Sequence, residues 1–485
     1  PWKGETAEGR VEPGIYWCSV YRKEQEDRVF TFPLYVEAGA PPEETIYLTG
    51  ELLPGSDDPD ELLEKLVDNV YGKRWNVTNV PFYFEKSTLL DAKALETFTH
   101  TAKPATCGLC TNHCSLTVNT FDGGRRFISG NRCSRPLGKA KVELPDLYNY
   151  KYKKLRSLEG KGSGDGSRLR IGIPFGLNMY ENLPFWFELF TALNFEVVLS
   201  PESSRKLYIK GQRTIPSDTV CYPAKLLHGH VVALVEKGVD AIFYPCLSFN
   251  FNEEISDNCY NCPVVAYYPE LLAANVPDLK QVRFLDPYVG LHRPKDYERI
   301  GAQWFRDTFG VPKKEAAAAI RRAYAAYDAY KQDIRTTGQA YIDQARREGR
   351  PIIVLAGRPY HIDPEINHGI NDLITSFGFV LVSEDAVAFH EDYAPRKVLN
   401  QWTFQSRMYN AARYVCEQPD MQLIQLVSFG CGTDAITGDE VRSILEDGGK
   451  LYTQLKIDDI SNLGAVKIRV RSLMAAMDER KKNNQ

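Results

Sequence analysis

The chain alternates short apolar runs with helical patterns, and it does so twice in the same order. Within residues 169–272, apolar runs at 169–174 and 195–199 flank an apolar helical stretch at 184–193, and the alternation restarts at the run 351–356. Strands that alternate with helices form parallel sheets that are covered on both faces. The sequence therefore predicts an α/β fold: two doubly wound parallel-sheet domains, flavodoxin-like or Rossmann-like, related as a pseudo-repeat.

Each unit continues with further elements of the same kind. We expect a helix at 224–237 and strands at 240–245 and 263–268 in the first unit, and helices at 366–377, 396–418 and 439–447 with strands at 379–383, 423–428 and 450–455 in the second. The Gly- and Ser-rich stretch 159–168 reads as a linker. The predicted division is therefore an N-terminal mixed segment (1–100), a four-cysteine hairpin module (101–160), a first α/β domain (168–290), a helical connector (291–349) and a second α/β domain (350–480).

Composition narrows the class of protein. The net charge of the 485-residue chain is −4, so no strong overall field recruits nucleic acid or an anionic membrane. The sequence holds no apolar run of about 18 residues, and charged residues occur throughout the first thirty, so we expect neither a membrane-spanning helix nor a signal peptide in it. Eleven cysteines, an odd number in a chain of this size, favour a reduced, cytoplasmic setting. Because the chain begins at Pro1, we expect a fragment or a split partner.

Four cysteines form a compact group of candidate metal ligands. The predicted strands 115–121 and 125–129 pair as a hairpin, which brings the flanking thiols together. Four converging thiolates suit either a closed zinc site or an iron–sulfur cubane, and the spacing leaves both open. The group consists of Cys107, Cys110, Cys114 and Cys133.

Five more cysteines are dispersed over the two α/β units. Cys246 follows Ile171 by 75 residues and Cys431 follows Ile353 by 78, so both thiols come just after equivalent strands. Ligands bind doubly wound sheets at that edge, which indicates a site in a cleft between the units. The predicted cofactor-binding residues are Cys221, Cys246, Cys259, Cys262 and Cys431. We expect Cys18 and Cys416 to be plain core thiols.

Two polar segments are candidates for the same cleft. The stretch 357–369, GRPYHIDPEINHG, follows a predicted strand and carries many titratable groups. Of these we take Arg358, His361, Glu365 and His368 as catalytic candidates, which could relay protons or tune a neighbouring cluster. Lys225, His228 and His230 follow Cys221 on a helix whose first amides could face an anion; an ordinary helix with a partly exposed histidine is the alternative.

Several longer motifs resemble one known family. They are NMYENLPFWFELFTALNFEVVLSP, CYPAKLLHGHV, SFGCGTDA and LKIDDISNLGAVKIRVRSLMAA, together with the 357–369 stretch. They are similar to the large activase-associated members of the 2-hydroxyacyl-CoA dehydratase and benzoyl-CoA reductase superfamily, which includes double-cubane cluster proteins. The resemblance covers about residues 100–480. It implies iron–sulfur clusters held by cysteines at the ends of doubly wound sheets, here Cys221, Cys246, Cys262 and Cys431.

The resemblance also implies a function. The chain would accept low-potential electrons from an ATP-driven activase of actin-like fold, fused or in trans, and pass them to a substrate in reductase or dehydratase chemistry. By the same analogy the substrate would be an acyl-CoA, and the chain would form a homodimer. The sequence has no Walker A motif, so ATP hydrolysis is not assigned to it. Three thiolates would leave one iron of a [4Fe-4S] cubane open, whereas a double-cubane [8Fe-9S] cluster with six thiolates needs one more ligand than the five dispersed cysteines.

Two rival functions remain open at this stage. One is a zinc-stabilised α/β binding or regulatory protein without redox activity. The other is a thiol oxidoreductase that uses Cys259 and Cys262 as a C-x2-C pair. The strand predicted to start at Pro263 argues against the second rival, because such pairs precede helices.

Overall fold

The structure is a computed structural model, and contacts divide it into two compact units. One comprises residues 1–103 and 118–127, and the other comprises residues 104–117 and 128–485. The described residues are 98–107, 115–121, 124–130, 144–162, 164–390, 399–428, 431–457 and 463–483, together with short strands before residue 87. The predicted segments 168–290, 291–349 and 350–480 all belong to the second unit.

The first part of the chain forms small sheets. β1 (Glu5–Thr6) pairs with β2 (Gly9–Arg10), and β3 (Gly14–Tyr21) lies between β4 (Arg28–Val36) and β5 (Tyr83–Lys86) in antiparallel register. A third sheet has the order β6 (His100–Thr106), β7 (Ser115–Phe121) and β8 (Arg126–Ser129). Strands β7 and β8 lie where the hairpin was predicted.

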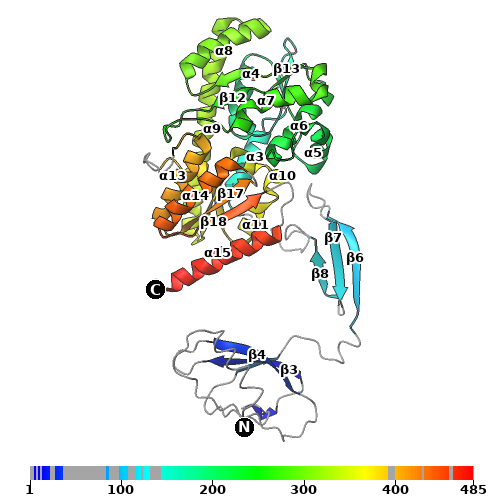
Figure 1. The fold of residues 1–485 in the computed structure, drawn as a ribbon, viewed down its shortest axis with the longest axis vertical. Helices are drawn as coiled ribbons and strands as arrows, with labels where there is room; N and C mark the ends of the chain where they lie inside the picture. The colour runs from blue at the N-terminus through cyan, green and yellow to red at the C-terminus, as the bar shows by residue number, and fades with distance from the viewer. Residues whose placement is uncertain are drawn as a thin grey trace. The chain divides into compact units, whose positions relative to one another are not determined.

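Two four-stranded parallel sheets form the body of the second unit (Figure 1). The first has the order β10 (Glu196–Leu199), β9 (Arg170–Ile173), β11 (Ala241–Phe243), β13 (Arg283–Leu285), and the second has the order β16 (Val380–Ser383), β15 (Ile352–Ala356), β17 (Met421–Ser428), β18 (Thr453–Ile457). Both sheets thus follow the order second, first, third, fourth strand. In this topology the switch point, where ligands bind, lies between the first and third strands.

Helices cover both sheets. They are α3 (Leu147–Arg156), α4 (Met179–Ala192), α5 (Arg205–Gly211), α6 (Tyr222–Glu236), α7 (Pro263–Asn275), α8 (Pro294–Phe309), α9 (Lys313–Arg347), α10 (Pro364–Asn367), α11 (Ile370–Ser376), α12 (Glu384–Val387), α13 (Thr403–Glu417), α14 (Gly432–Asp447) and α15 (Leu463–Asn483). Short 3-10 turns η3 (Gln212–Thr214), η4 (Pro277–Gln281) and η5 (Pro359–Ile362) and a small parallel pair, β12 (Cys246–Phe249) with β14 (Tyr288–Gly290), complete the unit.

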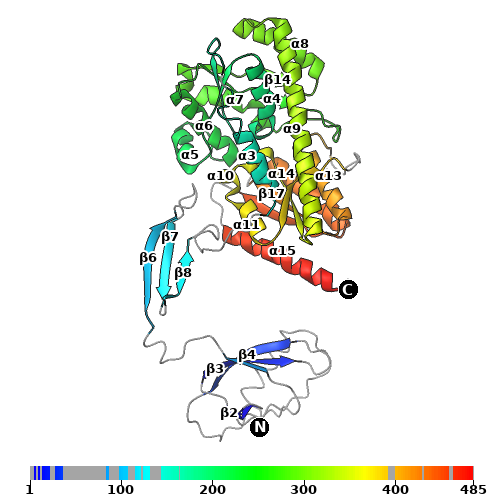
Figure 2. The ribbon, with the colours of Figure 1, turned by 180° about the vertical axis from the view of Figure 1, so that it is seen from behind.

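The long helix α9 connects the two sheets. Its alanine-rich sequence favours helix, and its buried side chains, among them Ile320, Tyr327 and Ile334, recur at three- and four-residue steps. One stretch of α9 packs on α4 and α8, and another packs on β16 and α12 (Figure 2). The helix therefore fixes the two halves of the unit against each other.

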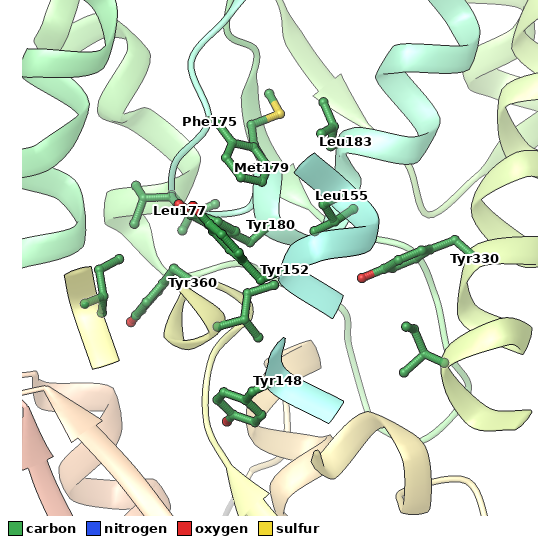
Figure 3. Packing of buried hydrophobic residues seen from close by; sticks show 14 of the residues in the cluster. Tyr148, Tyr152, Leu155, Phe175, Leu177, Met179, Tyr180, Leu183, Tyr330 and Tyr360 are labelled. Carbon is green, nitrogen blue, oxygen red and sulfur yellow. The ribbon is translucent and has the colours of Figure 1, made fainter. Parts of the chain in front are cut away.

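Helix α3 is part of the same core. Figure 3 shows Tyr148, Tyr152 and Leu155 of α3 among side chains of the first sheet region, of α9 and of the segment after β15. The hydroxyl of Tyr148 donates a hydrogen bond to the carbonyl of Leu355 at 3.0 Å. Residues 147–156, which the sequence placed in the hairpin module, therefore pack within the α/β body.

One predicted element is wrong. Residues 263–268 were expected to form a strand, but they begin the helix α7. The run PVVAYY is rich in β-formers, and so short a run does not separate strand from helix by periodicity. Pro263 occupies the first helical position, where its missing N–H is not needed and its φ suits a helix.

Candidate functional site

Three of the dispersed cysteines share one local structure. Cys221, Cys262 and Cys431 are the N-cap residues of α6, α7 and α14, and each has an extended backbone. Proline in the first turn favours the helix starts after Cys221 and Cys262. The Sγ of Cys262 accepts a hydrogen bond from the backbone N–H of Val265 at 3.5 Å. Helix N-termini stabilise negative charge, so these three helix starts would offset part of the charge of a ligand set bound there.

The three thiols also lie in one electrostatic environment. Burial raises the pKa of Cys221 to about 12, and the thiols of Cys262 and Cys431 act in the same direction, while Arg358 opposes them. Burial likewise raises the pKa of Cys262, opposed by Arg358 and reinforced by Cys431. Two thiols from the first sheet region and one from the second therefore lie within electrostatic range of one another. Without added positive charge, burial keeps Cys221 and Cys262 protonated.

Arg358 joins this group at the switch point of the second sheet. It follows β15, and its Nη2 lies 3.8 Å from the Sγ of Cys431. The same Nη2 donates to the Oγ1 of Thr433 at 2.8 Å and to the carboxylate of Asp434. Asp434 also accepts from the backbone N–H of Ser428 at 2.8 Å. The Nε of Arg358 is buried and has no hydrogen-bond partner among the described residues.

The rest of the 357–369 stretch also lies against the thiols. The hydroxyl of Tyr222, next to Cys221, donates to the carboxylate of Glu365 at 2.9 Å, and the Tyr222 ring stacks on His368 with centroids 6.4 Å apart. Tyr360 is buried, and its pKa is raised by burial, with Cys221 and Cys262 adding to the shift. Glu365 and His368 therefore reach the thiol region through Tyr222.

His361 has a different environment. Its Nδ1 accepts a hydrogen bond from the backbone N–H of Arg358 at 2.8 Å, which makes Nε2 the protonated nitrogen. That Nε2 has no hydrogen-bond partner among the described residues. Burial lowers the pKa of His361 to about 3, and the positive charge of Arg358 makes a smaller contribution in the same direction. His361 is therefore neutral, and its ring accepts a hydrogen bond that positions the backbone of Arg358.

Cys246 and Cys259 have other neighbours. Cys246 is buried in β12, where the nearby charges are Glu270 and Asp286. The charges near Cys259 are Arg293 and Glu253. Cys246 begins β12, whereas Cys431 caps α14, so the two cysteines follow their strands in different local structures. Cys246 still lies near the thiol group, because burial raises the pKa of Tyr244 and Cys246, Cys262 and Cys221 all add to this shift.

The structure describes the side chains of two of the remaining cysteines, Cys107 and Cys416. Cys107 is buried against Leu116, whereas Cys110, Cys114 and Cys133 lie outside the described residues. The Sγ of Cys416 packs in α13 and donates to the carbonyl of Ile444 at 3.4 Å. Within the described ranges, no group of three or more His, Cys, Asp or Glu side chains converges on a single metal ion.

A chain of hydrogen bonds joins Tyr268, His228 and Thr214. Of these three residues, only His228 was predicted from the sequence. The Oγ1 of Thr214 donates to the carbonyl of Gly211 at 2.8 Å, so the Nδ1–H of His228 donates to Thr214 at 2.7 Å. The Nε2 of His228 then accepts from the hydroxyl of Tyr268 at 3.0 Å. The pKa of Tyr268 is raised by burial and by Cys221.

The other two polar residues of α6 are also buried. His230 lies between the hydroxyls of Ser200 and Ser203, and Lys225 is 8% exposed. His228 and His230 are both fully buried, so the alternative of a partly exposed histidine on α6 is wrong.

Comparisons with known proteins give one informative result. A periplasmic binding protein from Veillonella parvula DSM 2008 is similar over 60% of this chain and 79% of its own, but at 9% identity and a TM-score of 0.15 it supports no argument. No curated protein matches. Within the residues the structure describes, no helix is long and apolar enough to cross a membrane. Residues 170–387, which hold Cys221, Cys262 and Arg358, match the CoA enzyme activase uncharacterised domain (DUF2229), so this part of the chain is similar to a domain associated with CoA enzyme activase.

Proposed function

We propose that this chain is an iron–sulfur protein that accepts low-potential electrons from an ATP-driven CoA enzyme activase, in trans or fused, and passes them to a substrate. The observation that carries the proposal is that three helix-capping thiols, Cys221, Cys262 and Cys431, lie within electrostatic range of one another and of a buried arginine. The similarity of residues 170–387 to an activase-associated domain supports the choice of partner.

The donor set fits an iron–sulfur cluster. Thiolates are the ligands such clusters require, and three helix N-termini with Arg358 offset their negative charge. A cluster of several irons spreads its ligands over different metal atoms, so the thiols need not converge on one point as they do around zinc. When bound, such a cluster supplies one-electron transfer at low potential.

Three ligands suit a [4Fe-4S] cubane with one iron open. A double cubane would need ligands beyond these three thiols. The second cluster or zinc site at Cys107, Cys110, Cys114 and Cys133 stays a prediction, as does a homodimer.

The protein's own residues prepare the site. Arg358 links the start of α14 to the end of β15. The Nδ1 of His361 accepts a hydrogen bond from the backbone N–H of Arg358 and so fixes the position of Arg358. The rings of Tyr222, Tyr268 and Tyr360 are buried or half-buried beside the thiols and limit the access of water. The chain from Tyr268 through His228 to Thr214 offers a route for protons that accompany electrons. Reductase or dehydratase chemistry on an acyl-CoA is the proposed use, on the strength of the domain similarity alone.

The test is anaerobic reconstitution with iron and sulfide, followed by metal analysis. We expect Cys221→Ala, Cys262→Ala and Cys431→Ala each to lower bound iron and the broad absorption near roughly 400 nm that thiolate-to-iron charge transfer gives. Cys416→Ala is the matched control, since its thiol packs in α13 against the carbonyl of Ile444. Unchanged iron in Cys431→Ala would sink the proposal. Colourless protein with stoichiometric zinc would support the zinc-stabilised binding protein instead.

A thiol oxidoreductase that uses Cys259 and Cys262 is the weaker alternative. The helix α7 after Cys262 removes the argument that a strand follows the pair, but the thiol pKa values still disfavour it. A reactive C-x2-C pair has a lowered thiol pKa. Here burial raises the pKa of both Cys259 and Cys262. The two thiols also face different charges, Arg293 and Glu253 for the first and Arg358 for the second.

A further inference from the structure

One loop of the first sheet region lies against the second sheet region. Residues 250–262, the cysteine loop, join β12 to α7 and carry Cys259 and Cys262. The loop contacts the segment 399–407, which includes the start of α13. Helix α13 packs on α14, and Cys431 is the N-cap of α14. The contacts of the cysteine loop with this segment therefore connect Cys262 to Cys431 through the protein.

Backbone hydrogen bonds hold the second part of the cysteine loop. The N–H of Asp257 donates to the carbonyl of Asn400 at 2.8 Å, and the N–H of Tyr260 donates to the carbonyl of Gln401 at 2.9 Å. The N–H of Thr403 donates in return to the carbonyl of Tyr260 at 3.3 Å. These bonds do not depend on side chains, so they remain when a side chain elsewhere in the loop is replaced.

A buried ion pair holds the first part of the same loop. Arg407 of α13 donates from Nε to the Oε2 of Glu253 and from Nη2 to the Oε1 of Glu253, at 2.7 Å in both bonds. The two side chains are 1% and 2% exposed. Two parallel N–H···O bonds fix the orientation of both groups as well as their distance. The pair resists displacement of the loop, because neither buried group has water as a substitute partner.

Arg407 has a second carboxylate partner outside the loop. Its Nη2 donates to the Oε1 of Glu181 in α4 at 2.6 Å, and the same oxygen accepts from the hydroxyl of Tyr327 at 2.7 Å. The side chain of Glu181 is 2% exposed, as is that of Glu253. Two equally buried carboxylates thus bind one arginine, but only Glu253 belongs to the loop that carries Cys262.

We propose that Glu253 is a positioning residue of the thiol site. Through Arg407 it holds the start of the cysteine loop on α13, and it thereby sets the position of Cys262 relative to Cys431. The inference rests on the iron–sulfur function proposed above, because it concerns how firmly Cys262 is held as a ligand.

The test compares Glu253→Gln with Glu181→Gln in the reconstituted full chain. The first variant places an amide NH2 where Arg407 needs an acceptor. The second removes a charge from the same arginine but can keep both bonds of Oε1. We expect iron release to a ferrous chelator to be about tenfold faster in Glu253→Gln than in the wild type, the equivalent of one hydrogen bond to a charged group. The EPR spectrum of the reduced cluster should change as well, whereas Glu181→Gln should keep the wild-type rate and spectrum.

Hydrogen exchange of the metal-free chain gives a measurement that needs no cluster. Amides of the cysteine loop should exchange faster in Glu253→Gln than in the wild type, and Glu181→Gln should leave their exchange unchanged. Faster exchange spread evenly over the chain would mean a general loss of stability and would contradict a positioning role.

Two further results would overturn the inference. One is a wild-type release rate and spectrum in Glu253→Gln, and the other is an equal change in both variants. A wild type that binds no iron would instead refute the proposed function, and the hydrogen exchange of the loop would still decide whether Glu253 holds it.

Discussion

The Nη2 of Arg358 lies 3.8 Å from the Sγ of Cys431, and the same nitrogen donates to the carboxylate of Asp434. One guanidinium thus serves a thiol and a carboxylate on the first turn of α14. The side chains of Arg358 and Asp434 are only 4% and 3% exposed, so neither charge has an alternative partner in solvent. The position of Cys431 therefore depends on a buried ion pair that links two adjacent strand ends of the second sheet.

Replacement of Arg358 by Gln should destabilise the protein by about 3–5 kcal/mol, because it leaves Asp434 buried without its cation. The measurement is the free energy of unfolding in urea. The double variant Arg358→Gln with Asp434→Asn is the control, and it should lose less than the sum of the two single variants. Additive losses would contradict the idea that the two residues act as a pair.

Acid should destabilise the fold through His230. Burial, then Arg156, lowers its pKa to about 3 in the folded protein, below the ordinary value of 6.5. Below pH 6.5 the unfolded chain binds a proton that the folded chain does not. The free energy of unfolding therefore decreases as the pH is lowered, by about 2 kcal/mol between pH 7 and pH 5. His230→Gln should remove that slope. Ser200→Ala, which removes a partner of the ring without removing the titration, should keep it.

Asp363 should act in the opposite direction. Its pKa is raised to about 6, chiefly by burial, although Ser203 and Tyr180 bond to it. Between the ordinary pKa of Asp and about pH 6, the carboxyl of Asp363 is protonated in the folded state and ionised in the unfolded state. The free energy of unfolding therefore decreases as the pH rises through this range, by up to about 3 kcal/mol. Asp363→Asn should therefore gain relative to wild type between pH 5 and pH 8, as measured in urea. A constant difference between the two proteins would contradict the raised pKa.

The alternation of apolar runs predicted all four strands of the second sheet and three of the four in the first, where β13 was missed. The predicted runs 169–174 and 351–356 correspond to β9 and β15, because strands buried on both faces are continuous apolar runs. The prediction of a strand at 263–268 is wrong because periodicity does not separate a strand from a helix in so short an apolar run. A signal was present nonetheless: proline in the first helical turn, as after Cys221 and Cys262, is typical of a helix start.

The site was harder to predict than the fold. Sequence reasoning named Arg358, and it named Cys246 and Cys259 with equal weight although they lie near other charges. It missed Tyr222 and Asp434, whose roles arise from contacts with residues more than seventy positions away. Such long-range pairs leave no local pattern. The packing of the two sheet regions brings Tyr222 to Glu365, and the pairing of β15 with β17 brings Arg358 to Asp434.

Gly229 is the position where a single methyl group should disturb the thiol site. A Cβ at Gly229 would lie 2.0 Å from the carbonyl oxygen of Leu207, a backbone atom that cannot move without α5. Since α6 begins at Cys221, relief of this clash would shift a candidate ligand as well as the two helices. Gly229→Ala should therefore cost about 1–3 kcal/mol or more in unfolding free energy.

Gly432→Ala is the matched control, because a Cβ there meets no atom within 4 Å. Alanine in the first turn of α14 also has the better helix propensity, by up to about 1 kcal/mol. The control should therefore be neutral or stabilising, even though it adjoins Cys431. Equal stability of the two variants would mean that α5 yields freely, and the close approach of α5 and α6 would then not hold Cys221 in place.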